Sequence, residues 1–152
     1  MITEKMKVYL DNCCFNRPYD DQTNIKVEVE TKAKLYIQAL IADGAVDLVW
    51  SYMLDFENSK NTHHQKAMAI QKWQDLSVLD VDEAVEIIEI SKVIQSTGIK
   101  PADSLHIACA IYGDSDCFIT VDNRLLKYKS DKIIICDPIE FLRIREVKHY
   151  DK

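Results

Sequence analysis

PADSLHIACA, residues 101–110, is the stretch of this sequence that decides the fold. Pro101 suits the first turn of a helix, where a missing backbone N–H costs no hydrogen bond. A helix from Ala102 to Tyr112 would be apolar on most of its sides, which is typical of a helix buried at the centre of a domain. The next apolar run, Cys117–Val121, has the length of a buried strand and leads directly into Asp122.

Short apolar runs alternate with helical patterns along the rest of the chain. Strands are expected at Lys7–Leu10, Asp47–Trp50, Ser77–Val81, Cys117–Val121 and Ile133–Cys136. Further helices are expected between and after these strands. One is expected to be capped by Asn24 and to stop at Gly44, a short one to carry Glu57, and one to run from a cap at Thr62 through Trp73. Another is expected to begin at a capping box formed by Asp80 and Glu83, and the last at Ile139. Residues 12–23 are expected to form a polar loop. The alternation predicts a single three-layer α/β/α domain, residues 1–152, with a central, mostly parallel sheet.

Composition excludes several classes of protein. Apolar residues make up 47% of the 152, with three glycines and three prolines, so disordered and fibrous classes are excluded. No apolar run reaches the roughly 18 residues that span a bilayer, and the first residues lack a signal-peptide pattern, so we expect a cytoplasmic protein with no membrane partner. The five cysteines form no C-x-x-C pair and lie mostly in apolar segments, which is typical of reduced thiols.

Four acidic residues lie near the ends of apolar segments: Asp11 closes MKVYLD, Glu57 closes VDLVWSYMLDFE, Asp103 opens the central helix and Asp122 closes CFITVD. Each alone has an explanation as a turn, a solvated helix residue or a helix cap. Together they are expected at one edge of a parallel sheet, where the carboxyl ends of strands meet. Their carboxylates would repel one another unless a hard cation such as Mg²⁺ or Mn²⁺ lay between them. We therefore predict a metal-dependent site that cleaves phosphoesters.

Two polar neighbours are expected to support this site. Thr120 lies two residues before Asp122 on the same side of the strand, and Asn12 lies beside Asp11. The formal net charge of −6 argues against nucleic-acid binding over a broad basic surface. Metal binding by the four acids would leave −2 on the rest of the chain (−6 + 4), so an RNA substrate stays compatible with the composition.

VYLDNCC, the glutamate of SYMLDFEN, PADSLHIACA and FITVDNRLL resemble the PIN-domain family of metal-dependent ribonucleases, from Val8 to about Leu142. The resemblance implies that the four acids bind one or two Mg²⁺ or Mn²⁺ ions and that RNA is cut to leave a 5′-phosphate and a 3′-hydroxyl. It also implies a homodimeric toxin paired with an antitoxin protein. Many members place a further acid shortly after the T-x-D aspartate, where this chain has Asn123 and Arg124, so the number of ions stays open.

Within this interpretation, Asp11, Asp103 and Asp122 are the expected main ligands. Glu57 is expected to complete the ligand shell or to orient the attacking water as a base. Arg17 and Arg124, with Asn12 and Thr120, are the candidate substrate-binding residues, because arginine side chains near the site could hold the RNA backbone. Arg17 belongs to the segment NRPYDDQ, residues 16–22, to which no role is assigned.

Two alternatives differ from a nuclease of this family. A catalytically silent PIN-like domain that binds nucleic acid or protein would have no reason to keep four costly acids. Another acid-rich α/β phosphohydrolase would place D-x-D after the first strand, where Asp11 is followed by Asn12 and Cys13. Glu30 is expected on the surface or beside a cap, with a place in the site as the alternative. His106 is expected to be a hydrogen-bonded packing residue, with orientation toward the site as the alternative.

Overall fold

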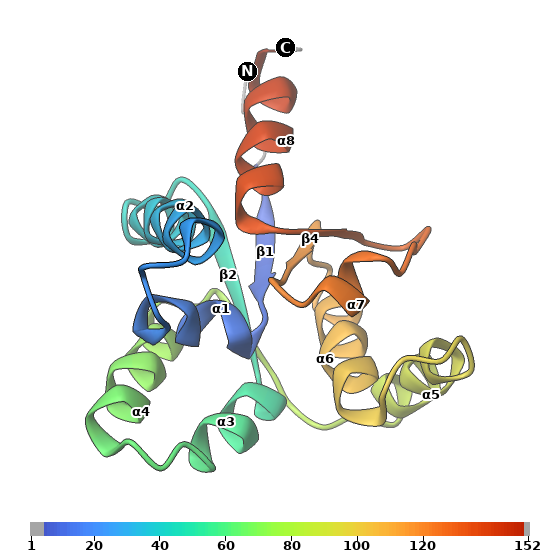
Figure 1. Cartoon of the computed structure of the whole chain (residues 1–152). Helices are drawn as coiled ribbons and strands as arrows, with labels where there is room; N and C mark the ends of the chain where they lie inside the picture. The colour runs from blue at the N-terminus through green and yellow to red at the C-terminus, as the bar shows by residue number, and fades with distance from the viewer. Residues whose placement is uncertain (1–4, 151–152) are drawn as a thin grey trace.

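The computed structural model describes residues 5–150, with side chains described as far as residue 147. At its centre lies one five-stranded sheet in which every neighbouring pair of strands is parallel (Figure 1). The strands are β1 (Lys7–Leu10), β2 (Asp47–Ser51), β3 (Leu79–Val81), β4 (Cys117–Ile119) and β5 (Ile134–Cys136). The predicted α/β fold with a parallel sheet is confirmed.

The order of the strands, β3-β2-β1-β4-β5, creates a reversal beside β1. The chain first builds outward from β1 to β2 and β3, and then crosses to β4 on the other side of β1. The register pairs Tyr9 with Phe118, and the backbone N–H of Asp11 continues the ladder by donating to the carbonyl of Ile119 at 2.9 Å. In parallel α/β sheets a ligand crevice opens at the carboxyl ends of two such strands. The fold therefore directs attention to the residues that follow β1 and β4.

Helices connect the strands and cover the sheet. They are α1 (Asn12–Asn16), α2 (Ile25–Ala42), α3 (Tyr52–Ser59), α4 (His64–Gln71), α5 (Val85–Gln95), α6 (Pro101–Tyr112), α7 (Asn123–Leu126) and α8 (Pro138–Tyr150), with the 3-10 helices η1 (Arg17–Tyr19) and η2 (Lys72–Leu76). The predicted limits of α2 are confirmed, because the Asn24 side chain accepts from the Val27 N–H at 3.2 Å and Gly44 follows the helix with φ +78°. None of the helices described is long and apolar enough to cross a membrane.

Three local predictions were wrong. Residues 12–23 are not a continuous loop, since they contain α1 and η1. The cap of α4 is His63 rather than Thr62, because the His63 Nδ1 accepts from the Lys66 N–H at 3.3 Å. The capping box of Asp80 and Glu83 does not form: Asp80 lies within β3, and α5 begins at Val85 without a side-chain cap.

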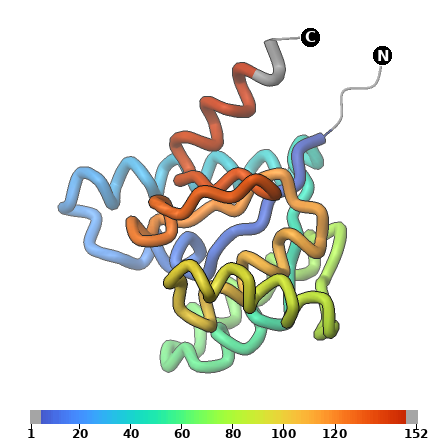
Figure 2. Tube along the Cα trace, turned by 90° about the vertical axis from the view of Figure 1, so that its right-hand side faces the viewer, coloured from blue at the N-terminus to red at the C-terminus, as the bar shows by residue number. Residues whose placement is uncertain are grey.

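The two faces of the sheet carry different helices, because alternate residues of a strand point to opposite sides. Tyr9 of β1 reaches His106 of α6, so α6 covers this face. Trp50 points to the other face, where its ring meets that of Phe15 in α1 edge-on, with centroids 5.4 Å apart. Figure 2 shows α2 and α8 on one side of the sheet and α5 and α6 on the other. The predicted three-layer arrangement is confirmed.

Candidate active site

Asp11 ends β1 and caps α1. Its Oδ1 accepts a hydrogen bond from the Asn12 backbone N–H at 2.8 Å, and its Oδ2 accepts from the Thr120 hydroxyl at 2.8 Å and from the Cys13 thiol at 3.2 Å. Asp11 is 7% exposed, and this burial raises the pKa of its carboxyl group. Nearby His106 and the hydrogen bonds from Thr120 and Cys13 offset part of that increase. The carboxylate is therefore held in place at the reversal of the strand order.

Thr120 connects Asp11 to Asp122. Its fully buried hydroxyl, which donates to Asp11, also accepts from the Asp122 backbone N–H at 3.1 Å. Asp122 caps α7 by accepting from the Arg124 N–H at 2.9 Å, and the Arg124 Nη2 lies 3.3 Å from the Asp122 Oδ2. Burial acts to raise the pKa of Asp122, but the hydrogen bonds and charge of Arg124 outweigh it and lower this pKa. The cap geometry of Asp122 therefore also fixes its position relative to Asp11.

A buried chain of hydrogen bonds orients Glu57 of α3. The His106 Nε2 contacts the Glu57 Oε1, the His106 Nδ1 lies 2.7 Å from the Tyr9 hydroxyl, and that hydroxyl lies 2.6 Å from the Ser51 Oγ. When Nε2–H donates to the carboxylate, Nδ1 is the acceptor, so Tyr9 donates to His106 and Ser51 donates to Tyr9. Ser51 also caps α3 by accepting from the Leu54 N–H at 3.3 Å. The residue that begins α3 thus supports the carboxylate that α3 carries.

The pKa of Glu57 reflects this arrangement. Burial favours its neutral form, but the hydrogen bond and the electrostatic attraction of His106, with the hydrogen bond from Asn12, outweigh burial and lower the pKa of Glu57 below its ordinary value. His106 is buried and hydrogen-bonded, as expected, but the alternative, orientation toward the site, also holds because its Nε2 contacts Glu57. His106 itself is fully buried.

Asp103 lies in the first turn of α6, as predicted. Burial raises the pKa of its carboxyl group, and the negative charges of Asp11 and Asp122, followed by Glu57, raise it further. Among residues 5–147 no side chain or backbone group donates a hydrogen bond to the Asp103 carboxylate. The structure therefore brings the four predicted acids into one electrostatic neighbourhood, in which His106 offsets only part of the repulsion on Asp103.

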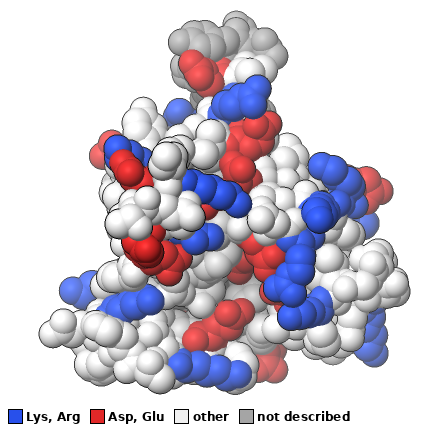
Figure 3. Space-filling model, viewed as in Figure 1, with Lys and Arg blue, Asp and Glu red and all other residues white. Residues whose placement is uncertain are grey.

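The donor set suits a hard divalent cation. Carboxylate oxygens are the ligands that Mg²⁺ and Mn²⁺ prefer, and burial together with the neighbouring carboxylates raises the pKa of Asp103. Within the described side chains, no three His, Cys, Asp or Glu residues already lie in a metal-ligand arrangement. His106 holds Glu57 through Oε1, which leaves Oε2 beside Asn12 for an ion, whereas Asp122 would exchange its contact with Arg124 on binding one. Figure 3 shows acidic side chains in the middle of one face with Lys and Arg side chains on both sides.

The candidate substrate-binding residues have different surroundings. The Asn12 Nδ2 lies 3.4 Å from the Glu57 Oε2, while the buried Asn12 Oδ1 has no hydrogen-bond partner among the described atoms. Arg124 is two-thirds exposed and lies against Asp122. Thr120 contacts Asp11 through its hydroxyl. Asn12, Thr120 and Arg124 therefore all touch one of the four acids, and their contact with substrate stays a prediction.

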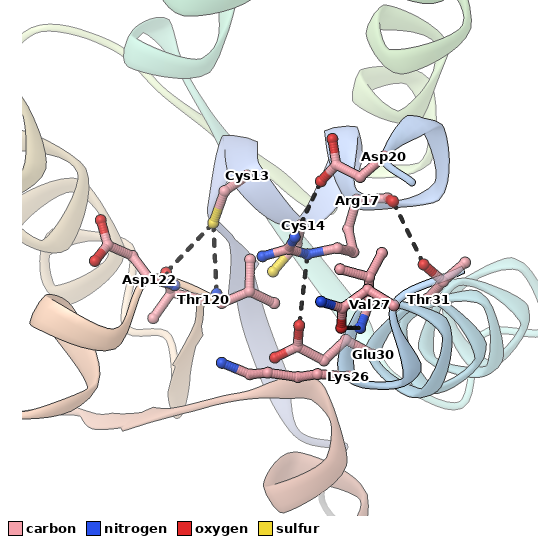
Figure 4. A network of polar contacts seen from close by, with 12 residues as sticks. Cys13, Cys14, Arg17, Asp20, Lys26, Val27, Glu30, Thr31, Thr120 and Asp122 are labelled. Carbon is pink, nitrogen blue, oxygen red and sulfur yellow. Dashed lines mark hydrogen bonds and ion pairs between the residues drawn. The ribbon is translucent and has the colours of Figure 1, made fainter. Parts of the chain in front are cut away.

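Arg17 is engaged in ion pairs at the other end of α1. Its Nη1 lies 3.1 Å from the Asp20 Oδ2, and its Nε lies 3.5 Å from the Glu30 Oε1 (Figure 4). Glu30 is 2% exposed, so the expectation that it lies on the surface or beside a cap was wrong. Burial raises the pKa of Glu30, and the charges of Arg17 and Lys26 partly offset this. The residues NRPYDDQ thus supply the counter-ion of a buried carboxylate, and substrate binding by Arg17 stays a prediction.

Sequence reasoning missed two members of this neighbourhood. Cys13 was treated as a small apolar side chain, but its thiol donates to Asp11 and lies 3.4 Å from the Thr120 Oγ1 (Figure 4). Tyr9 was treated as a strand residue, yet its hydroxyl supports His106. The available signals were the positions of Cys13 two residues after Asp11 and of Tyr9 two residues before Asp11. Neither signal identifies the partner, which comes from another element.

The fold and the site together define a parallel α/β protein with an acidic centre at the reversal of its strand order. A sequence profile of the PIN domain matches residues 8–130. The chain therefore belongs to the PIN domain family, whose members are in general nucleases that use divalent metal ions. The resemblance found in the sequence is confirmed.

A solved structure shares the fold. The crystal structure of VapBC2 from Rickettsia felis bound to a DNA fragment from their promoter contains a chain that superposes with a TM-score of 0.53. The two chains are 13% identical, and the match covers 86% of this chain and 97% of that chain. At this identity the similarity concerns the fold alone. A comparison with curated protein sequences found no significant match.

Proposed function

We propose that this protein is a divalent-metal-dependent endoribonuclease. The observation that supports this most strongly is the convergence of Asp11, Glu57, Asp103 and Asp122 where the strand order reverses, with the pKa of Asp103 raised by burial and by the neighbouring carboxylates. Such a cluster is costly in a folded protein unless a cation compensates for it. Membership of the PIN domain family supports phosphodiester hydrolysis as the reaction.

Asp11, Asp103 and Asp122 would hold one Mg²⁺ or Mn²⁺ ion, and Glu57 would complete the ligand shell or accept a proton from the attacking water. A bound ion would relieve charge on the phosphoryl oxygens and activate water for attack. Thr120 and Cys13 hold Asp11 in place through its Oδ2, and His106 holds Glu57 through its Oε1. These contacts fix two of the four carboxylates before any ion arrives, which reduces the cost of organising the site.

Exposed Arg124, beside Asp122, would meet a phosphate of the substrate, and Asn12 would reach the same group. The net charge of −6 favours a short local contact over a long basic track. A single-stranded or looped RNA would fit this requirement, because one phosphodiester of a splayed chain can enter a narrow acidic site.

The test is cleavage of end-labelled RNA by the purified protein with Mg²⁺ or Mn²⁺, repeated with EDTA and with Asp11→Asn or Asp103→Asn. Cleavage should require the ion and be lost in both variants. Asp131→Asn is the matched control, since Asp131 is an exposed loop residue. Cleavage that survives EDTA and both substitutions would rule out the proposed mechanism. Metal-independent RNA binding without cleavage would instead favour a catalytically silent PIN-like domain.

The biological role that we propose is that of a toxin in a toxin–antitoxin pair, acting in the cytoplasm as a homodimer. The solved structure with the same fold is described as a VapBC2 complex on promoter DNA, which supports a partner protein for this chain. Expression of the protein should arrest growth, and Asp103→Asn should relieve the arrest. Co-expression of the product of an adjacent small gene should do the same. Growth that is unaffected by the active protein would argue against this role.

A further inference from the structure

A cleft formed by α1, η1, α2, α4 and η2 is lined by two buried polar side chains that lack a hydrogen-bond or ion-pair partner among the described residues. The cleft has a volume of about 130 Å³, and its walls include Phe15, Tyr19 and Trp73. Lys34 and Gln38, one turn apart on α2, also line it. We call it the Lys34 cleft. Of the elements that form it, only α1 also contributes to the acidic site.

Lys34 is an unusual lysine. It is 4% exposed, and its ammonium group makes no hydrogen bond or ion pair with any residue of the described chain. Its Nζ lies 5.6 Å from the centroid of the Phe15 ring. Burial lowers the pKa of Lys34 to about 8. Buried lysines are usually paired. Lys34 Nζ has no ion-pair partner among the described residues, but it is not one of the fully enclosed polar atoms, so the ammonium keeps some contact with solvent at the cleft.

Gln38 adds a second unpartnered group to the same cleft. It is 5% exposed, and its Nε2 is enclosed without a hydrogen-bond acceptor among the described atoms. A buried amide N–H that lacks an acceptor costs free energy comparable to a lost hydrogen bond. Both Lys34 and Gln38 therefore present donors, and neither has an acceptor.

The chain itself does not supply the missing anion. The Cys14 thiol is engaged with the carbonyl of Ile119 at 3.4 Å, and burial raises the pKa of Cys14 well above its ordinary value, so the sulfur is neutral. Glu30, the buried acid on the same helix, is already paired with Arg17. No acidic group among the described residues therefore pairs with the Lys34 ammonium.

The geometry points to a carboxylate ligand: the Lys34 cleft binds a monovalent carboxylate attached to a small apolar group. A single ammonium balances one negative charge, and the aromatic walls accept the apolar part of the ligand. The small volume suits a short-chain carboxylic acid or the acidic side chain of a peptide. Both sources share the same chemistry, and the experiment below separates them.

The experiment is a ¹⁵N NMR titration of the whole protein with propionate and, separately, with the neutral-ended peptide acetyl-Leu-Glu-Leu-amide. The indole N–H of Trp73 reports on the cleft, and the amide of Gly98 in the α5–α6 connection serves as a reference. Propionamide, which has the shape of propionate without its charge, is the ligand control. We expect a saturable shift at Trp73 with a carboxylate and none with propionamide.

Two variants test the residues. Lys34→Met should weaken carboxylate binding at least tenfold and raise Tm, because it removes an uncompensated buried charge and keeps the apolar stem. Gln38→Leu should weaken binding less. Lys32→Met is the matched control, since Lys32 lies on the same helix with its side chain 75% exposed, and binding should not change.

The source of the carboxylate follows from the affinities. Tighter binding of propionate would identify a small acid, and tighter binding of the peptide would identify an acidic protein side chain. The proposal is overturned if neither probe gives a saturable shift at millimolar concentration, or if Lys34→Met binds as well as the wild-type protein. An increase in Tm of Lys34→Met without any binding by the wild-type protein would also overturn it, because the cleft would then hold a destabilising lysine with no carboxylate ligand.

Discussion

Replacing Lys34 by methionine should stabilise the protein at neutral pH. Lys34 is 4% exposed and has no ionic partner among the described residues, and burial lowers its pKa from 10.5 to about 8. A pKa unit corresponds to about 1.4 kcal/mol, so the ammonium costs the folded state up to roughly 3 kcal/mol. Methionine keeps the apolar stem in contact with Phe15 and removes this cost. We expect the free energy of unfolding to increase by about 2 kcal/mol, allowing for some hydration of the ammonium.

The sign of the pH dependence distinguishes this cause from better packing. Below pH 8 Lys34 is protonated in both the folded and the unfolded state, so the cost is fully present. Between about pH 8 and 10.5 the folded state releases its proton first, and the stability contributed by this group increases. The stability difference between Lys34→Met and the wild-type protein should therefore be largest at pH 7 and shrink as pH rises toward 10.5.

The assay is urea unfolding followed by circular dichroism at several pH values between 7 and 10.5. Lys32→Met should change the free energy of unfolding by less than about 0.5 kcal/mol, because the Lys32 side chain is 75% exposed. A Lys34→Met protein that is less stable than the wild type at pH 7 would refute the reasoning. So would a stabilisation that is the same at every pH.

Three further substitutions test the polar contacts of the site and of its surroundings. Thr120→Val should lower the free energy of unfolding by about 1–3 kcal/mol, because the buried Thr120 hydroxyl donates to Asp11 and accepts from the Asp122 N–H. Urea unfolding measures this loss, and the control Thr97→Val should show a smaller one. Arg17→Met should lower the free energy of unfolding by about 3 kcal/mol, because it leaves the buried Glu30 carboxylate unpaired. The double variant with Glu30→Gln should recover part of this loss. If the two single effects simply add in the double variant, the pairing of Arg17 with Glu30 is contradicted. His106→Leu should weaken Mn²⁺ binding by about 10- to 100-fold, because His106 orients Glu57. An unchanged Mn²⁺ affinity in calorimetry would show that this orientation is unimportant.

The parallel sheet could be predicted from sequence because its signals are local. Each strand is a short apolar run, and the helices between the strands show their own period of hydrophobic residues. The position of Asp103 could also be predicted, because Pro101 marks the start of α6. The topology then brings the end of β1 beside the end of β4 without any further information from side chains.

The contacts that were missed depend on residues distant in the chain. The helix α1 replaces the expected loop because Asp11 caps it and Phe15 packs against Trp50 of β2. The burial of Glu30 depends on Arg17, which lies in a different element. The contact of His106 with Glu57 arises from the packing of α6 on α3. No local pattern around either residue of these pairs predicts the other.

We propose that Asp11, Glu57, Asp103 and Asp122 form one divalent-metal site. The most direct test is to measure Mn²⁺ binding, using electron paramagnetic resonance to monitor the free ion. The wild-type protein should bind Mn²⁺ saturably, and Asp11→Asn and Asp103→Asn should each weaken binding at least about tenfold, since each loses a carboxylate worth about 1.4 kcal/mol or more to the ion. Asp131→Asn should bind like the wild type. Equal affinities in Asp103→Asn and Asp131→Asn would contradict the claim.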